Sequence, residues 1–119
     1  MGYDVSRSIA VKINGKSLAN VEKVETFYQR DRTIQDGKLS VSLKSIDVKI
    51  TRKRRIEDVY SDGVEFQPLK NFSLSVSYPH HDTSYDSCEW ADYKEFLGEN
   101  DTVIEELTVA SLSYKFATS

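Results

Sequence analysis

The side chains best suited to chemistry in this sequence are two adjacent histidines and one cysteine. His80 and His81 stand before Asp82 and could offer metal ligands. Neighbouring side chains of an extended chain point in opposite directions, and no second His or Cys pair completes a tetrahedral set, so exposed turn residues are favoured. Cys88 could act as a nucleophile with a histidine as base, but its position two residues from Trp90 on one strand face favours a small core residue. Neither group predicts a catalytic or metal centre.

Charged residues give two further candidates. The basic run from Arg52 to Arg55 could bind phosphates, but a pI near 5.4 and the lack of aromatic or glycine-rich companions favour a solvated face or a patch between subunits. The strand neighbours Glu105 and Glu106 diverge and form no acid–base pair. The sequence also has no glycine-rich phosphate loop and no nucleophile elbow. We therefore expect a protein that is not an enzyme and that has no cofactor.

The elements that position these residues are β-strands. Apolar residues alternate with serine over Leu39–Leu43 and Phe72–Tyr78, and this two-residue period is typical of half-buried antiparallel strands. Asn14-Gly15 and Asp36-Gly37 supply the left-handed residues of two-residue hairpins. We expect a mainly β fold, an antiparallel β-sandwich or barrel with long hairpins and at most one short helix, in a single domain of residues 1–119.

The same alternation predicts where strands become irregular. We expect a bulge or break near Asn20 and a bulge at Lys44-Ser45, where the apolar phase changes. A further phase change is expected at Val109-Ala110. The one short helix is expected over Arg52–Tyr60, where side chains recur at i,i+4, and Ser61-Asp62-Gly63 would end it.

Residues 29–38 are polar and surround the Asp36-Gly37 turn, with Ile34 as their one apolar anchor. If the flanking strands continue across the turn, they form a polar hairpin arm that projects past the sheet. Such an arm has nothing to bury in its own domain. It is either a mobile loop or a contact with another subunit.

The net charge of −3 conceals a division between two halves of the chain. Residues 1–55 hold 13 Lys/Arg against 6 Asp/Glu, a charge of +7, and residues 56–119 hold 3 against 13, a charge of −10. Basic and acidic strands could pair inside one sheet, or the halves could form two sides of a molecule that binds its own copies head to tail. The candidates for subunit contact are Arg30, Arg32, Ile34, Asp36, Arg52, Lys53, Arg54, Arg55, Glu105 and Glu106.

The expected setting is soluble and cytosolic at synthesis. No run of about 18 apolar residues could span a membrane, and the first residues lack the apolar core of a signal peptide. Met1-Gly2 followed by Ser6 fits the short myristoylation pattern, but two fixed positions arise easily by chance, and we expect an unmodified terminus. The lone Cys88 excludes an internal disulfide and suits a reducing compartment.

Several segments resemble the strands of bacteriophage tail tube and related tail proteins. The resemblance lies in Phe72–Tyr78, in the aromatic strand Ser87–Tyr93, in the return strand Thr102–Ala110 and in the first hairpin Val11–Val21, about half of the chain together. It implies small β-sandwich or barrel subunits that join their sheets around a ring, commonly a hexamer, and stack into a hollow tube. It also implies an extended hairpin that reaches the neighbouring ring, a role that residues 29–38 are placed to fill.

We therefore expect a structural subunit of a phage tail tube, or of a related contractile or secretion tube, with a central channel for DNA. Its partners would be its own copies in rings expected to be hexameric, other tail proteins, and DNA that passes without specific binding. Its location would be the virion tail, and the host cytoplasm during assembly. Two alternatives stay open: a small phage-encoded protein that inhibits a host factor, and a tail terminator, baseplate or head-completion protein that forms one ring.

Overall fold

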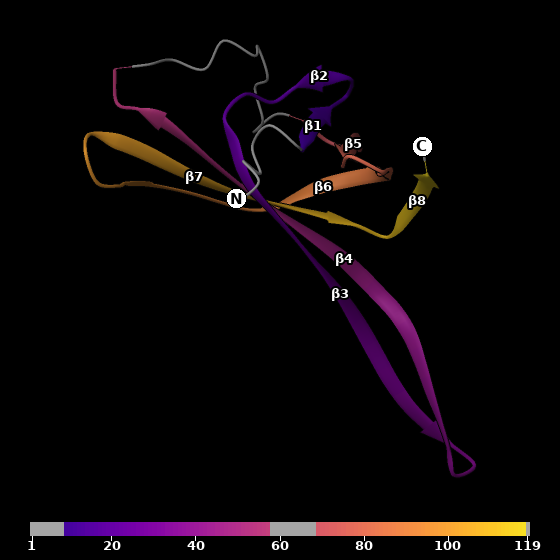
Figure 1. The fold of residues 1–119 in the computed structure, drawn as a ribbon. Helices are drawn as coiled ribbons and strands as arrows, with labels where there is room; N and C mark the ends of the chain where they lie inside the picture. Colours follow the sequence, from indigo (N-terminus) through magenta and orange to yellow (C-terminus); the bar gives the residue numbers. More distant parts are fainter. Residues whose placement is uncertain (1–8, 58–68, 119) are drawn as a thin grey trace.

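Every regular element in the described part of the chain is a β-strand. The computed structural model describes residues 9–57 and 69–118, which are drawn in colour in Figure 1. Along the chain the strands are β1 (Ala10–Ile13), β2 (Lys16–Ser17), β3 (Val21–Gln35), β4 (Lys38–Arg55), β5 (Phe72–Ser77), β6 (His81–Leu97), β7 (Thr102–Ser111) and β8 (Ser113–Thr118). Within these residues no helix is long and apolar enough to cross a membrane. The prediction of a mainly β fold with long hairpins is confirmed.

The strands form one antiparallel sheet in the order β2–β1–β5–β6–β7–β4–β3, and β8 pairs with β6 beside this path. The first half of β6 pairs with β5 and β8, and its second half pairs with β7, so β6 connects two parts of the sheet. The end strands β2 and β3 do not pair with each other. The sheet is therefore open, because a barrel requires its first and last strands to join.

One hydrophobic core joins the two parts of the sheet. Its apolar side chains alternate along each strand with outward-facing residues, as the two-residue period predicts. Phe72 packs against Trp90 at a ring-centroid distance of 4.7 Å, and Cys88 is fully buried beside them. The most deeply buried aliphatic residues come from both parts of the sheet: Val11, Ile13, Leu74, Val76, Ile46, Val48, Ile50, Leu107 and Val109.

The predicted turns and bulges in the first half of the chain are confirmed. Asn14-Gly15 and Asp36-Gly37 both have positive φ angles, as two-residue hairpins require. Asn20, with φ 61°, separates β2 from β3. In the β3–β4 hairpin, Gln29 pairs with Ser45 and Arg30 pairs with Leu43, so Lys44 is the extra residue of a bulge.

The predicted helix over Arg52–Tyr60 is wrong for the residues that the structure describes. Strand β4 continues to Arg55, and a turn follows at Ile56 and Glu57. The basic run is the end of a strand, and its side chains alternate between the two faces of the sheet. Arg52 faces the interior, where its cross-strand partner on β7 is Glu105. Residues 58–63, with the end of that helix and its stop signal, lie outside the described residues, as does the myristoylation pattern within residues 1–8.

The predicted phase change at Val109-Ala110 lies further along the chain. Alternation in β7 continues to Ser111, which is buried although it is polar. Its hydroxyl lies 2.8 Å from the carbonyl oxygen of Asp86 and 2.9 Å from that of Ser113 and can donate its proton to either, so the polar side chain is satisfied inside the sheet. The chain bends at Leu112 and then continues as β8 along β6.

We expect the thiol of Cys88 to react with Ellman's reagent at pH 8 only after the protein unfolds. Burial raises the pKa of this thiol to about 11, so about one molecule in a thousand carries the reactive thiolate at that pH. Its Sγ also lies 3.3 Å from the carbonyl oxygen of Tyr85. Absorbance at 412 nm, with and without denaturant, measures the reaction, and rapid stoichiometric labelling of the folded protein would contradict the burial.

Candidate assembly surfaces

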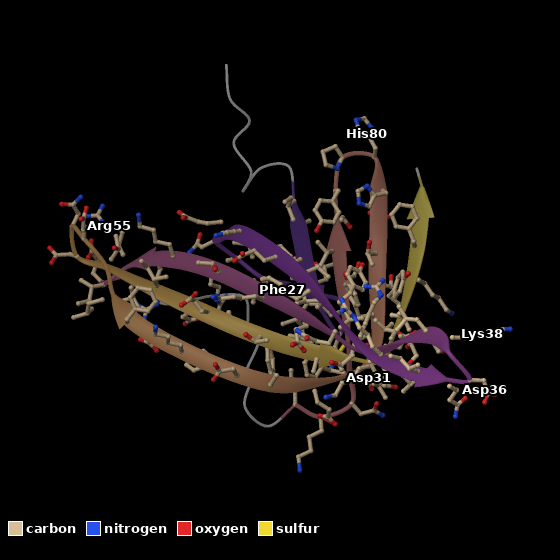
Figure 2. The ribbon with its side chains drawn as sticks, turned by 90° about the horizontal axis from the view of Figure 1, so that it is seen from below. Phe27, Asp31, Asp36, Lys38, Arg55 and His80 are labelled. Carbon is tan, nitrogen blue, oxygen red and sulfur yellow. The ribbon has the colours of Figure 1, made fainter. Side chains whose placement is uncertain are left out.

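The β3–β4 hairpin extends far beyond the rest of the sheet. Figure 1 shows it projecting away from the other strands, and the molecule measures 60 Å along its longest axis. Strand β4 pairs with β7 only from Ile46 onward, so residues 29–45 belong to the two strands of the hairpin alone. We call residues 29–45 the arm. Its turn at Asp36 lies at the far end in Figure 2.

One face of the arm is apolar. Cross-strand pairing places Ile34 opposite Leu39, while Val41 and Leu43 lie further along the same face. These four residues, which we call the apolar strip, are exposed, with 75% of Ile34 and 65% of Leu39 accessible. Of these four residues, only Ile34 was predicted from the sequence as an apolar anchor of the arm. The alternation of Leu39, Val41 and Leu43 with serine was visible in the sequence, but it also fits a half-buried strand of the core.

The apolar face of the arm also carries two guanidinium groups. Arg30 pairs with Leu43 across the hairpin and Arg32 pairs with Val41. The guanidinium carbon of Arg30 lies 5.6 Å from the ring centroid of Tyr28, a cation–π distance. Asp31, the carboxylate within the strands of the arm, alternates to the opposite face. The arm therefore offers an apolar row with two positive charges beside it.

Strand β8 presents a second exposed apolar surface near the base of the arm. Tyr114 pairs with the buried Tyr85, and the exposed Phe116 lies two residues further along β8. The Tyr114 ring meets that of Tyr28 edge-on at a centroid distance of 5.8 Å. Phe116 stacks on His81 at 4.9 Å, and His81 stacks on Tyr78 at 4.6 Å. His81 is thus packed between two aromatic rings.

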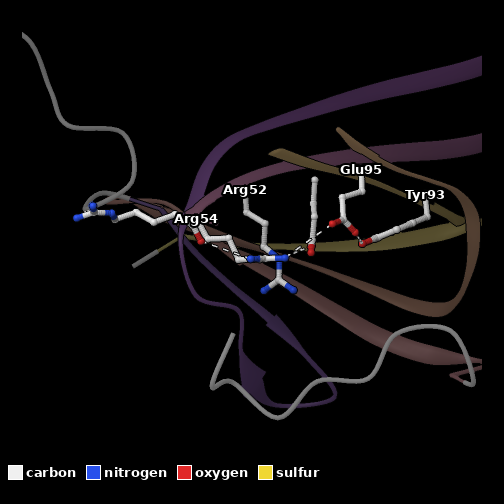
Figure 3. Close-up of polar contacts among 6 residues, drawn as sticks. Arg52, Arg54, Tyr93 and Glu95 are labelled. Carbon is white, nitrogen blue, oxygen red and sulfur yellow. Dashed lines mark hydrogen bonds and ion pairs between the residues drawn. The ribbon is translucent and has the colours of Figure 1, made fainter. Parts of the chain in front are cut away.

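The basic run of β4 is divided between the interior and the surface. Arg52 is 1% exposed and Glu105 is 4% exposed. The Nε of Arg52 donates to the Glu105 carboxylate at 2.8 Å. A guanidinium nitrogen of Arg54 lies 3.7 Å from a carboxylate oxygen of Glu95. Figure 3 shows Arg52, Arg54, Glu95 and Tyr93 together. Tyr93 donates to Glu95 at 3.0 Å, and burial together with the nearby carboxylates raises the pKa of Tyr93. Arg52 and Glu105 are therefore buried in the interior of the folded protein.

The rest of the run lies at the surface. Lys53 and Arg55 are exposed and line an open depression of about 280 Å³ together with Asn20, Glu22 and Thr102. Arg55 also pairs with Glu57 at 2.9 Å. These side chains are accessible to a partner.

On the outer face, Glu106 pairs with Lys49 at 2.7 Å. This contact lowers the pKa of the Glu106 carboxyl and raises the pKa of the Lys49 ammonium. Basic β4 and acidic β6 and β7 thus pair inside one sheet, which is one of the two explanations of the charge division.

The end of the β6–β7 hairpin is a further exposed surface. Phe96 and Leu97 are exposed, with 70% of Leu97 accessible, and the exposed Ile56 lies at the same end, where its amide donates to the Asp101 carbonyl at 2.7 Å. The turn residues Glu99 and Asp101 add two carboxylates. We call these five residues the β6–β7 tip. Figure 1 and Figure 2 place it at the opposite end of the molecule from the tip of the arm.

Within the described residues, no group of three or more His, Cys, Asp or Glu side chains could hold a metal ion. The surfaces that the fold does present are apolar and charged, and they are suited to contacts with other macromolecules.

No protein-family model matches the sequence, and a search of curated proteins found no relative. Solved structures match over most of the chain. A chain of the PVC sheath–tube complex, an extracellular contractile injection system in its extended state, has a TM-score of 0.64 at 8% identity, covering 94% of this chain and 89% of that one. A chain of the anti-feeding prophage tube-terminating cap gives 0.64 at 4% identity, with the same coverage. Hcp1 from Flavobacterium johnsoniae gives 0.59 at 12% identity, covering 94% and 96%. The chain therefore has the fold of the matched chains of the PVC sheath–tube complex, of the anti-feeding prophage cap and of Hcp1, in agreement with the resemblance of its sequence to tail proteins.

Proposed function

We propose that this chain is a structural subunit of a phage tail tube or of a related contractile injection tube. Copies form rings, expected to contain six subunits, and the rings stack around a central channel. The observation that carries the proposal is the arm, whose apolar strip is left exposed by the described residues of its own chain. The role is assembly rather than catalysis. In a phage, the assembled tube would belong to the virion tail, it would meet other tail proteins, and DNA would pass through its channel.

The apolar strip is large enough to stabilise a stack of rings in which several arms bind at once. Each fully buried Leu, Ile or Val side chain contributes roughly 1.5–3 kcal/mol relative to exposure. Association itself costs about 4–15 kcal/mol, so a single arm gives a weak contact. A ring that places all its arms on the next ring makes these contacts together, and the cost of association is met once for the whole ring. Weak individual contacts then give a stable stack.

A tube-terminating cap is the second candidate. The similarity to the anti-feeding prophage cap, with a TM-score of 0.64, favours it as much as the similarity to the sheath–tube complex favours a tube subunit. A cap uses the same contacts within a ring but does not polymerise. The two functions differ in what the purified protein forms.

Negative-stain electron microscopy of the purified chain distinguishes these functions. We expect hollow tubes with a regular axial repeat at high protein concentration. Single rings that do not stack would identify the cap function. Light scattering on the same samples is the control for particles too small to see. A protein that stays monomeric at millimolar concentration would contradict both functions and would favour the binding of a host factor instead.

A further inference from the structure

The two glycine-containing hairpin turns of the sheet are held in different ways. Asn14-Gly15 lies against β5, where the Asn14 amide donates to the carbonyl oxygen of Ser73 at 2.9 Å. The Ser73 amide donates in return to the Oδ1 atom of Asn14, also at 2.9 Å. Two hydrogen bonds therefore fix both the backbone and the side chain of Asn14 to a neighbouring strand.

The turn at Asp36-Gly37 has no such support. Figure 2 places Asp36 at the far end of the arm, and β4 pairs with β7 only from Ile46 onward. Among the described residues, none forms a hydrogen bond or an ion pair with the Asp36 carboxylate. The last cross-strand pair before the turn joins Gln35 to Lys38. Opening the end of such a hairpin costs little free energy, so this turn opens more readily than the turn at Asn14.

An aspartyl–glycyl turn that opens can react with itself. The backbone nitrogen of Gly37 attacks Cγ of the protonated Asp36 carboxyl group, the N–Cγ bond forms and the C–OH bond breaks. The hydroxyl group leaves with the amide proton as water, and the product is a cyclic succinimide. Water then adds to one of the two ring carbonyls. Opening at Cγ returns aspartate, and opening at the backbone carbonyl carbon gives isoaspartate, whose main chain runs through Cβ and Cγ.

The surroundings of Gly37 favour this attack. A Cβ atom at this position would meet no atom within 4 Å, so the neighbouring nitrogen is open to approach. The β3–β4 pairing ends at Gln35 and Lys38, and the Gly37 amide lies beyond it. The reaction needs no oxidant, reductant or cofactor.

We propose that Asp36-Gly37 is a site of spontaneous isoaspartate formation in the unassembled subunit, and that the contacts with Ser73 protect Asn14-Gly15 from the equivalent reaction. At an asparagine the same ring closes with loss of ammonia instead of water. The arm therefore carries a slow chemical modification site at its tip, while the turn inside the body of the sheet keeps its original residue.

Isoaspartate would change the outer end of the apolar strip. A two-residue turn of this type requires left-handed backbone at both central residues, as the φ angles of 52° at Asp36 and 74° at Gly37 show. The longer main chain of isoaspartate does not fit this turn, so the nearby pair of Ile34 and Leu39 loses its register. Subunits that stay unassembled should therefore lose their ability to stack as they age. This consequence rests on the proposed function, whereas the modification itself does not.

Peptide mapping tests the modification. The purified full chain is kept dilute at neutral pH and 37 °C, and a second sample is kept in guanidinium chloride. Trypsin cuts after Arg32 and Lys38 and releases residues 33–38, in which isoaspartate appears as a separately eluting peptide of unchanged mass. Labelling by an isoaspartyl methyltransferase counts the modified residues independently. We expect isoaspartate in this peptide from both samples.

Asp36→Asn gives an internal comparison, because the variant carries two Asn-Gly turns in one chain. In the folded variant, position 36 should react at least about tenfold faster than Asn14. In guanidinium chloride the two positions should react at similar rates, since both are followed by glycine and the contacts with Ser73 are lost. The mass change that accompanies loss of ammonia measures both rates in the same digest.

Asp36→Gly is the matched control for the effect on assembly. Gly-Gly also favours this turn, but position 36 then has no carboxyl group. Freshly purified protein and the aged control variant should form tubes alike. In the aged unmodified chain, the mass of tubes should fall in proportion to the isoaspartate content.

The outcomes separate the modification from the proposed function. A peptide of residues 33–38 that gains isoaspartate only in guanidinium chloride would overturn the proposal. Equal rates at positions 14 and 36 in the folded Asp36→Asn variant would overturn the protection by Ser73. Chains that contain isoaspartate and still stack normally would overturn the loss of assembly. Fresh protein that forms neither tubes nor rings would contradict the proposed function, while the modification site stands on the peptide map alone.

Discussion

Shortening the arm should abolish stacking and leave the subunit folded. In the variant, residues 34–39 are replaced by Asn-Gly, which places a two-residue turn directly after the existing pair of Thr33 and Ser40. The removed side chains are all exposed, so the core loses no contact. We expect the melting temperature of the monomer to change by no more than a few degrees. We expect tubes to be absent even at the highest concentration, because Ile34 and Leu39 of the apolar strip are gone.

Circular dichroism melting and electron microscopy on the same preparation measure the two effects. Asp36→Asn is the matched control, because it introduces the same Asn-Gly turn in an arm of unchanged length. This variant should assemble as the unmodified chain does. Tubes of normal length from the shortened variant would show that the arm is not a stacking contact, and the proposal would then lose its main support.

The largest effect on stability is expected at the buried ion pair of β4 and β7. Glu105→Gln leaves the guanidinium of Arg52, which is 1% exposed, without the carboxylate that accepts from it at 2.8 Å. Breaking a buried pair from one side typically costs about 3–5 kcal/mol, because the remaining charge stays buried without its counter-charge. A domain of this size has a total stability of about 5–15 kcal/mol. The single variant should therefore lose a large part of its free energy of unfolding.

Replacing both partners should recover much of this loss. Arg52→Met combined with Glu105→Leu removes both charges and keeps apolar volume in the same place, a change that is often neutral or stabilising in other proteins. Urea unfolding followed by circular dichroism compares the midpoints. Lys49→Met is the control, because it breaks the neighbouring, more accessible pair with Glu106 and should shift the midpoint less than Glu105→Gln does. Equal losses from Glu105→Gln and Lys49→Met would show that burial adds nothing to the pair.

The strands and turns could be predicted because their signals are local. Asn14-Gly15 and Asp36-Gly37 determine their turns by backbone conformation alone, and the structure gives all four residues positive φ. The bulge at Lys44 could be predicted because the apolar phase changes within two residues of it. Such features depend on side chains that are close in sequence.

The features that were missed depend on residues far apart in the chain. Nothing near Arg52 indicates that it is buried, because its partner Glu105 lies 53 residues away on another strand. The i,i+4 spacing of Arg55 with Val59 and of Ile56 with Tyr60 predicted a helix from Arg52 onward, where the strand instead continues to Arg55. Ser111 was missed for the same reason, since its buried hydroxyl is satisfied by the carbonyl of Asp86 on β6.

The assembly surfaces were predicted in part. Ile34 and the arm around it could be recognised because a polar hairpin beyond a sheet has nothing to bury. The other members of the apolar strip could not be told from core residues, because alternation reports one apolar face and not what covers that face. The β6–β7 tip gave no signal, since Phe96 and Leu97 end an ordinary strand and their exposure depends on where the hairpin ends in space.

The bulge at Lys44 keeps the aliphatic row on one side of the hairpin. From Val24 to Ile34, even-numbered positions keep one side of β3, whereas β4 switches from even to odd positions at Lys44. Because of that switch, Leu39, Val41 and Leu43 continue the side to which Ile46 belongs. Loss of Lys44 would leave the row on that same side, because Leu43 would then stand two positions before Ile46 in a regular strand. A deletion at this codon therefore removes the bulge and its extra twist, while the polymer keeps the same contact side.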